Sequence, residues 1–283
     1  MNTVASRIVR IGHSPDPDDA FMYYAIARGK VDTAGFTVVQ VLEDIESLNR
    51  RALAGELEVT AVSIHAYAHL AERYALMSCG ASMGDGYGPI VIAREPFPTA
   101  ALAGKTIAIP GTLTSAYLAL RLFLKTEFPF VVVPFDQILE AVAEGRADAG
   151  LVIHEGQLTY ANRGLAKIAD LGAWWGGRTA GLPLPLGGNA VRRDVGEDAM
   201  RALTRMYRDS IAYALANRAE ALAYAKDFGR GLDTATNDRF VGMYVNDLTL
   251  DYGERGRNSI RRFLDEGIAA GIVPPTGPVT FVA

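Results

Sequence analysis

The sequence has little that would indicate a disulfide, a metal site, a nucleic-acid partner or a membrane span. It contains one cysteine, Cys79, in 283 residues, which excludes an internal disulfide and a multi-cysteine metal site. The formal net charge is −4 and no basic run occurs, so the electrostatic footprint of a nucleic-acid-binding protein is missing. No apolar run is long enough to span a bilayer.

The first residues also lack the apolar segment and the small-residue cleavage site of a secretion signal. Together with the single cysteine, this predicts a reduced, cytoplasmic setting. No G-x-G-x-x-G or P-loop pattern occurs, so no nucleotide cofactor is indicated. Neither Ser63 nor Ser115 has the G-x-S-x-G surroundings of a serine hydrolase. We therefore expect a protein that works without a cofactor.

What the chain does have is an alternation of short apolar runs and amphipathic helical stretches. Its length exceeds that of a usual single hydrophobic core and favours two lobes. In one predicted strand–helix segment Asp44 caps the helix and Gly55 ends it. In a second such segment Asp136 and Gly145 have the same two roles. The weak repeat predicts two similar α/β lobes with mostly parallel sheets and a ligand cleft between them.

The pattern breaks at residues 84–89 and again at 182–187, both rich in glycine or proline. We place the two crossings between lobes there. Residues 1–89 and 186–283 are then expected to form a discontinuous first lobe, with residues 90–185 as the inserted second lobe. The C-terminal helices are interpreted as scaffold without a catalytic role.

In open parallel α/β sheets, ligands bind beyond the carboxyl ends of the strands. That rule selects the candidate site residues, because each follows an apolar run with strand character. The predicted cleft residues are Ser14 and Asp19 after the first strand, Ser63, the pair Thr114 and Ser115, and His154.

His154 is the candidate general base because it follows apolar residues at a strand end. Partial burial would lower its pKa and keep the ring neutral near pH 7. A structural histidine bonded within its loop is about equally compatible with the sequence alone. The expected location on the cleft wall favours the catalytic interpretation.

Hydroxyl groups form the rest of the candidate site. Thr114 and Ser115 begin a helix, where free backbone N–H groups bind carboxylates and other anions. Simple N-capping is the alternative, and both roles fit in one turn. Ser63 either faces the ligand or is a buried hydroxyl bonded to backbone.

Two groups of residues have side chains of the types that bind metals. His65 and His69 have a suitable spacing but lack a third ligand, and exposed helical histidines are the simpler interpretation. Asp16, Asp18 and Asp19 suit the N-terminus of a helix, where carboxylates are stabilised by the helix dipole. No metal site is predicted.

Several motifs together resemble those of the 1,4-dihydroxy-6-naphthoate synthases of the futalosine route to menaquinone. The resemblance covers nearly the whole chain, and its most specific parts are the Ala-Trp-Trp and Leu-Pro-Leu-Pro-Leu-Gly segments. The matching segments are Ser14-Pro15-x-Pro17-x-Asp19, Val41-Leu42-Glu43-Asp44, Leu48-Asn49, Ser63-x-x-Ala66-Tyr67-Ala68, Gly88-Pro89-x-Val91, Pro110-Gly111-x-x-Thr114, Ile153-His154-Glu155, Ala173-Trp174-Trp175 and residues 182–187.

The resemblance implies a fold like the type II periplasmic solute-binding proteins. It also implies a carbon–carbon lyase that converts cyclic dehypoxanthinyl futalosine, a small carboxylate, into 1,4-dihydroxy-6-naphthoate. The family's base would then be His154, and Ser63 and Thr114 would contact the ligand. The family commonly has Ser-Pro-Cys-Pro-Asn-Asp where residues 14–19 of this chain are Ser-Pro-Asp-Pro-Asp-Asp. Asp16 and Asp18 thus replace a cysteine and an asparagine, and these two acids disfavour an anionic ligand in that part of the cleft.

Two alternatives remain at this point. Chorismate dehydratase shares the fold and the pathway, although the His-Glu and Ala-Trp-Trp segments favour the synthase. A non-catalytic cytoplasmic solute-binding protein would close on its ligand and release it unchanged. The sequence does not indicate an oligomeric state.

Overall fold

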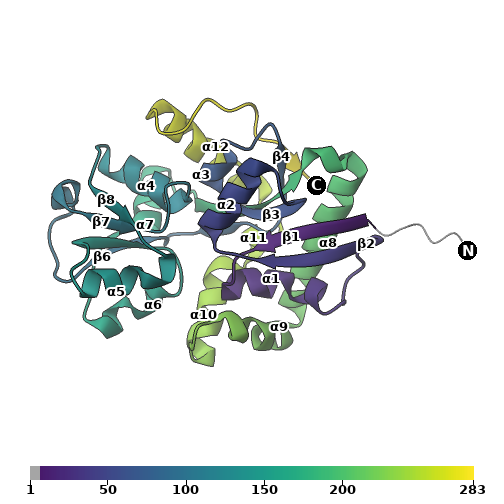
Figure 1. Cartoon of the computed structure of the whole chain (residues 1–283), viewed down its shortest axis with the longest axis horizontal. Coiled ribbons are helices and arrows are strands. Elements are labelled where there is room, and N and C mark those ends of the chain that lie inside the picture. Colours follow the sequence, from purple (N-terminus) through teal and green to yellow (C-terminus); the bar gives the residue numbers. More distant parts are fainter. Residues whose placement is uncertain (1–6) are drawn as a thin grey trace, which may run out of the picture.

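The computed structural model describes residues 7–283, and its strands form two sheets at opposite ends of the molecule (Figure 1). Within this range the larger sheet has seven strands and the smaller has five. The strands are β1 (Arg7–His13), β2 (Phe36–Leu42), β3 (Val59–Ser63), β4 (Tyr74–Met77), β5 (Ser82–Gly84), β6 (Ile90–Ala93), β7 (Ile107–Ile109), β8 (Phe130–Val132), β9 (Ala149–Val152), β10 (Ala166–Asp170), β11 (Leu184–Arg192) and β12 (Phe281–Val282).

Both sheets mix parallel and antiparallel pairs. The larger has the order β12-β4-β11-β3-β1-β2 with β5 beside β11, and the smaller has the order β10-β6-β9-β7-β8. β11 runs antiparallel to β3, β4 and β5, and β6 runs antiparallel to β9 and β10. The expectation of mostly parallel sheets is wrong. β6 and β11 enter directly from the other lobe without the crossover helix that parallel neighbours need.

Helices cover both faces of the larger sheet, and α1 packs against α8, α9 and α10. The helices are α1 (Pro17–Ala27), α2 (Ile45–Ala54), α3 (Ile64–Tyr67), α4 (Ser115–Leu124), α5 (Ile138–Ala143), α6 (Gly156–Thr159), α7 (Leu171–Arg178), α8 (Glu197–Ala216), α9 (Arg218–Ala225), α10 (Thr234–Tyr244), α11 (Asp247–Leu250) and α12 (Gly253–Ala269).

The predicted boundaries of α2 are confirmed. The side chain of Asp44 accepts hydrogen bonds from the backbone N–H groups of Glu46 and Ser47, and Gly55 ends the helix at a φ of 72°. The equivalent prediction for Asp136 is wrong, because this residue lies inside a short 3₁₀ turn (Phe135–Gln137) and its side chain caps nothing. α5 begins only after that turn.

The two lobes share one hydrophobic cluster. It contains Val62 and Tyr67 from the larger lobe, Ile107 and Leu118 from the smaller, and Trp175 from the segment that returns between them. The strands of the smaller sheet all lie between Ile90 and Asp170, which is compatible with the proposed 90–185 insertion. The exact division of the chain stays a proposal, because the shared cluster leaves no gap in packing to mark it.

Close backbone packing fixes the crossing before β6. A Cβ on Gly172, in the first turn of α7, would lie 1.8 Å from the carbonyl oxygen of Tyr87. Only glycine allows the two backbone segments to approach in this way.

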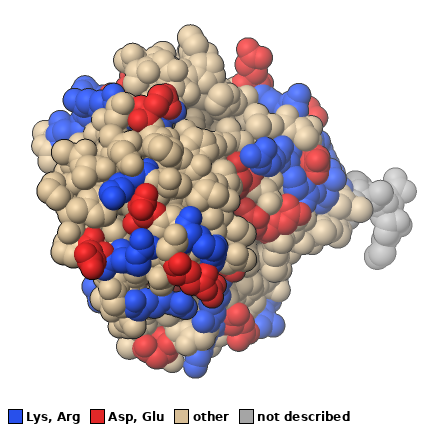
Figure 2. Space-filling view, turned by 60° about the vertical axis from the view of Figure 1, so that its left-hand side comes forward, with Lys and Arg blue, Asp and Glu red and all other residues tan. Residues whose placement is uncertain are grey.

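Charged side chains of both signs are interspersed over the face shown in Figure 2. In residues 7–283, no helix is long and apolar enough to cross a membrane.

Candidate active site

A cavity lies between the two sheets. Its empty volume is about 720 Å³, including the part that is open to solvent. Its lining combines carboxylates, hydroxyls, glycines and apolar side chains. The lining residues are Ser14, Asp16, Asp18, Asp19, Ile45, Ala61, Val62, Ser63, Gly80, Ser82, Pro89, Thr114, Ser115, Ala116, Ile153, Leu186, Gly187, Gly188, Asn189, Phe240 and Tyr244.

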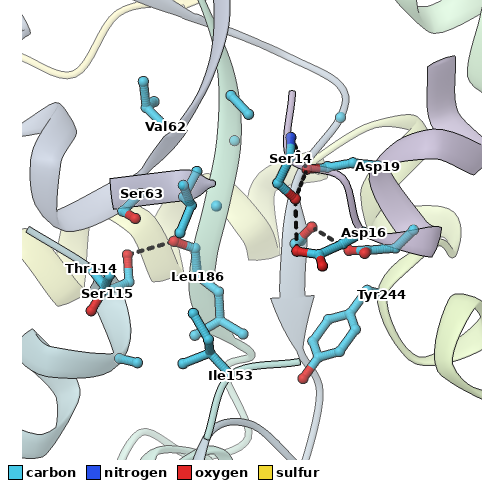
Figure 3. A pocket seen from close by; sticks show the side chains of 18 of the residues that line it. Ser14, Asp16, Asp19, Val62, Ser63, Thr114, Ser115, Ile153, Leu186 and Tyr244 are labelled. Carbon is cyan, nitrogen blue, oxygen red and sulfur yellow. Dashed lines mark hydrogen bonds between the residues drawn. The ribbon is translucent and has the colours of Figure 1, made fainter. Parts of the chain in front are cut away.

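One wall of the cavity is acidic. The hydroxyl of Ser14 lies 2.7 Å from Oδ2 of Asp16 and 2.8 Å from Oδ2 of Asp19, which also accepts the Ser14 backbone N–H (Figure 3). Asp18 accepts a 3.3 Å hydrogen bond from Ser82. Three carboxylates thus meet at the turn between β1 and α1.

Burial and the charges of their neighbours make the carboxyl groups of Asp18 and Asp19 weak acids. The pKa of Asp18 lies well above its ordinary value because of burial, reinforced by the charges of Asp19 and Asp16. Burial also raises the pKa of Asp19 to about 6, against the opposing effect of its hydrogen bonds from Ser14. A protonated Asp18 presents a donor to the cavity, as the amide of asparagine would.

These shifts predict that stability depends on pH. A carboxyl group whose pKa is higher in the folded than in the unfolded state stabilises the fold while it is protonated. The free energy of unfolding should therefore fall as the pH rises from about 4 through the folded pKa of Asp19, about 6, and towards that of Asp18. Asp18→Asn should raise the Tm more at pH 8 than at pH 5.

Differential scanning calorimetry at both pH values measures this difference. The matched control is Asp136→Asn, which changes an exposed carboxyl group and should give no such pH-dependent gain. An equal change in Tm at both pH values for Asp18→Asn would contradict the prediction.

The opposite wall is formed by the start of α4. Thr114 caps the helix, since its hydroxyl accepts the Tyr117 N–H at 3.2 Å and donates to the Gly111 carbonyl at 2.9 Å. Ser115 donates to the Leu186 carbonyl and accepts the His65 N–H at 3.1 Å. Both hydroxyls are therefore engaged within the protein. The first amides of the helix, which have no intrahelical acceptor, remain the groups suited to an anion.

Ser63 lies at the end of β3 and is held by Asn49 of α2. Its hydroxyl accepts from the Asn49 side-chain amide at 3.0 Å, while its backbone N–H donates to Asn49 Oδ1 at 2.8 Å. The hydroxyl proton has no acceptor among residues 7–283, so it can be donated to a ligand. Asn49 thus orients a hydroxyl that faces the cavity.

The ring of His154 is held by backbone groups of its own lobe. Ile153 lines the cavity in the described structure, but His154 is not among the lining residues. Its Nε2 donates to the carbonyl of Phe135 at 2.6 Å, and its Nδ1 accepts the Gly156 N–H at 3.1 Å. In this conformation the ring is bonded to the Phe135 carbonyl, and the catalytic role of His154 stays a prediction.

The pKa of His154 lies above its ordinary value, whereas the sequence predicted that burial would lower it. Burial alone lowers the pKa, but the neighbouring Glu155 carboxylate outweighs it and the net shift is upward. Nδ1 lies 3.3 Å from Oε2 of Glu155. Burial likewise disfavours ionised Glu155, yet its hydrogen bond and charge interaction with His154, and the charge of Arg230, lower its pKa to about 2.

His65 has a structural role. His65 is buried, not exposed as expected, and its Nδ1 lies 3.2 Å from the Thr114 carbonyl. Burial lowers its pKa to about 4. No group of three or more metal-ligating side chains occurs in the part of the chain that the structure describes.

The C-terminal helices contribute to the site, contrary to the prediction that they are only scaffold. Phe240 and Tyr244 of α10 line the cavity. The Tyr244 hydroxyl meets the side chain of Gln157 from the other lobe, with 2.9 Å between Oη and Nε2. The four-residue spacing of the two aromatic residues was a usable signal, since it places them on one helix face.

The chain matches known proteins along most of its length. The family model described as menaquinone biosynthesis matches residues 9–268. A 1,4-dihydroxy-6-naphthoate synthase of Thermus thermophilus is 44% identical, over 97% of this chain and 99% of the relative. The enzyme of that name from Streptomyces coelicolor is 39% identical, over 95% and 96%.

Solved structures have a similar fold. A crystal structure of an Archaeoglobus fulgidus protein superposes with a TM-score of 0.90 at 46% identity, covering 95% of this chain and 100% of that one. An alkanesulfonate-binding protein of Xanthomonas axonopodis has a TM-score of 0.72 at 14% identity, covering 97% and 98%. The second likeness confirms the expected fold of a periplasmic binding protein. The chain belongs to the menaquinone biosynthesis family and, within it, to the 1,4-dihydroxy-6-naphthoate synthases.

Proposed function

We propose that the chain converts cyclic dehypoxanthinyl futalosine into 1,4-dihydroxy-6-naphthoate, with His154 as general base. The observation that supports this most directly is the cavity between the lobes. Ser14, Asp19, Ser63, Thr114 and Ser115 all line it, and it combines an acidic wall, an apolar middle and a helix N-terminus. These three regions suit three parts of the proposed substrate.

The aromatic carboxylate would lie against α4. Its ring would pack on the apolar residues Ile153, Leu186 and Phe240, while its carboxylate accepts hydrogen bonds from the first amides of the helix. A helix N-terminus carries partial positive charge and favours an anion there. Ser63 adds a hydroxyl donor on the same side (Figure 3).

The sugar-derived part would then face the acidic wall. Carboxylates accept hydrogen bonds from sugar hydroxyls. The carboxylate of the substrate would be repelled at this wall. In this orientation Asp16, which departs from the family pattern, discriminates against a ligand bound the other way round.

His154 would remove a proton from carbon, and the electrons would flow into ring opening and aromatisation with loss of the sugar-derived carbons. The ring has to turn away from the Phe135 carbonyl to do so. His154 directly follows Ile153, which lines the cavity. Catalytic hydrogen bonds often form only in the substrate complex, so its present position is compatible with this role.

The test is to incubate the purified protein separately with cyclic dehypoxanthinyl futalosine and with chorismate. Chromatography and absorbance should detect naphthoate from the first and no enolpyruvyl benzoate from the second. Recovery of the futalosine derivative unchanged after tight binding would refute the proposal in favour of a binding protein. Product from chorismate alone would refute it in favour of the dehydratase.

A further inference from the structure

Arg230, which follows the 3₁₀ turn Lys226–Phe228, connects the two lobes. On the side of the larger lobe, its guanidinium donates to Asp16 at 2.9 Å and to the carbonyl of Pro15 at 3.1 Å. On the side of the smaller lobe, it donates to both carboxylate oxygens of Glu155, at 3.1 and 3.2 Å. One side chain thus binds a carboxylate of each lobe.

The two residues that Arg230 contacts in the smaller lobe are those that hold His154. Glu155 lies 3.3 Å from Nδ1 of the imidazole. The guanidinium carbon lies 4.6 Å from the centroid of the Phe135 ring, and the Phe135 carbonyl accepts the hydrogen bond from Nε2. Arg230 does not touch His154 itself, so any effect on the imidazole passes through these neighbours.

Nδ1 of His154 has two competing partners. The Glu155 carboxylate favours the charged imidazolium, while the Gly156 N–H, 3.1 Å from the same nitrogen, favours the neutral ring. The charged groups that act on His154 are Glu155 from its own loop, Asp16 from before α1, and Arg230, which faces both carboxylates. Among these groups Arg230 is the cation that offsets the two negative charges.

We propose that Arg230 is a positioning residue that the larger lobe presents to Glu155, so that the Glu155 carboxylate holds a proton on His154 less strongly than it would without the guanidinium. The inference rests on the proposed role of His154 as base. A side chain of the larger lobe thereby acts on the candidate base of the smaller lobe.

The charge balance sets the direction of each substitution. Loss of the Arg230 charge leaves Glu155 and Asp16 uncompensated, which favours the imidazolium and raises the pKa of His154. Loss of the Glu155 charge leaves burial as the main effect and lowers that pKa. Arg230 and Glu155 variants therefore move the same group in opposite directions, which a general loss of structure would not do.

The experiment is an NMR titration of the full chain with ¹⁵N,¹³C-labelled histidine, without substrate. The chain has four histidines, and the spectrum of His154→Asn identifies the His154 signal. Arg230→Gln and Arg230→Met should each raise the pKa of His154 by about 1 unit. Glu155→Gln should lower it, and Arg230→Lys should restore a value near that of the unmodified chain.

The matched control is Arg218→Gln. Arg218 also binds a carboxylate, Asp238, at 2.6 Å and lies 5.5 Å from the ring of Phe21, but all three residues belong to the larger lobe. Its loss should leave the His154 titration unchanged. An unchanged pKa in Arg230→Gln and Arg230→Met, or a shift of equal size in Arg218→Gln, would overturn the inference.

Kinetics separate this inference from the proposed function. The acidic limb of kcat/KM should move to higher pH in Arg230→Gln and to lower pH in Glu155→Gln, since only the neutral ring accepts a proton. If the unmodified chain does not convert the futalosine derivative, the proposed function fails whatever the titration shows. If it does convert it and the Arg230 variants titrate normally, the inference alone fails.

Discussion

His154→Asn is expected to lower the turnover of cyclic dehypoxanthinyl futalosine by roughly 10²–10⁴, the usual contribution of a positioned general base. Asparagine has no group that accepts a proton at neutral pH, although its amide can still donate to the Phe135 carbonyl, as Nε2 does at 2.6 Å. Binding should remain close to normal, because His154 does not line the cavity in the described structure. The prediction is therefore a loss in kcat with little change in Kd.

Single-turnover kinetics and calorimetric titration measure these two quantities separately. His69→Asn is the matched control, because His69 is exposed on the larger lobe and should retain turnover. Activity of the unmodified chain should decline as the pH falls through the pKa of His154, which lies above its ordinary value. Near-normal turnover in His154→Asn would remove this residue from the mechanism.

Trp175→Ala is expected to lower the free energy of unfolding by about 3–5 kcal/mol, the usual cost of truncating a buried aromatic residue. Trp175 is fully buried. Its ring packs edge-on against Phe263 at 5.3 Å between centroids, and its Nε1 donates to the carbonyl of Pro183 at 3.1 Å. The side chain therefore supports the segment where the chain returns to the larger lobe.

Urea denaturation followed by circular dichroism measures the change. Trp174→Ala is the control, since this neighbouring residue is only partly buried and contacts Phe123 and Arg178 near the surface. It should cost clearly less. Equal losses for the two variants would show that burial at this position does not determine stability.

The sequence predicted those parts of the site that depend on local rules. Ser14, Ser63 and Thr114 line one cavity because each lies at the carboxyl end of a strand or in the segment after it, where side chains of parallel neighbours converge. The ends of α2 were also predictable, since a cap and a left-handed glycine act within a few residues.

The parts that were missed depend on contacts between distant segments. The ring of His154 is turned by the carbonyl of Phe135, and Tyr244 reaches the cavity only because α10 packs beside the larger sheet. Arg230 forms ion pairs with Asp16 and Glu155, which are both distant from it in sequence. Such side chains have no signature in their own neighbourhood, so periodicity and spacing do not reveal them.

The order of the strands has a consequence for synthesis on the ribosome. The five strands of the smaller sheet, β6 to β10, are contiguous in sequence among the described residues, so this sheet can be completed as soon as β10 emerges. The larger sheet still lacks β11, which separates β3 from β4, and β12 at its edge. Until β11 emerges, β3 and β4 therefore lack a neighbour on one edge, and unpaired strand edges are prone to aggregation. The nascent chain is thus most in need of a chaperone in the interval between the emergence of β4 and that of β11.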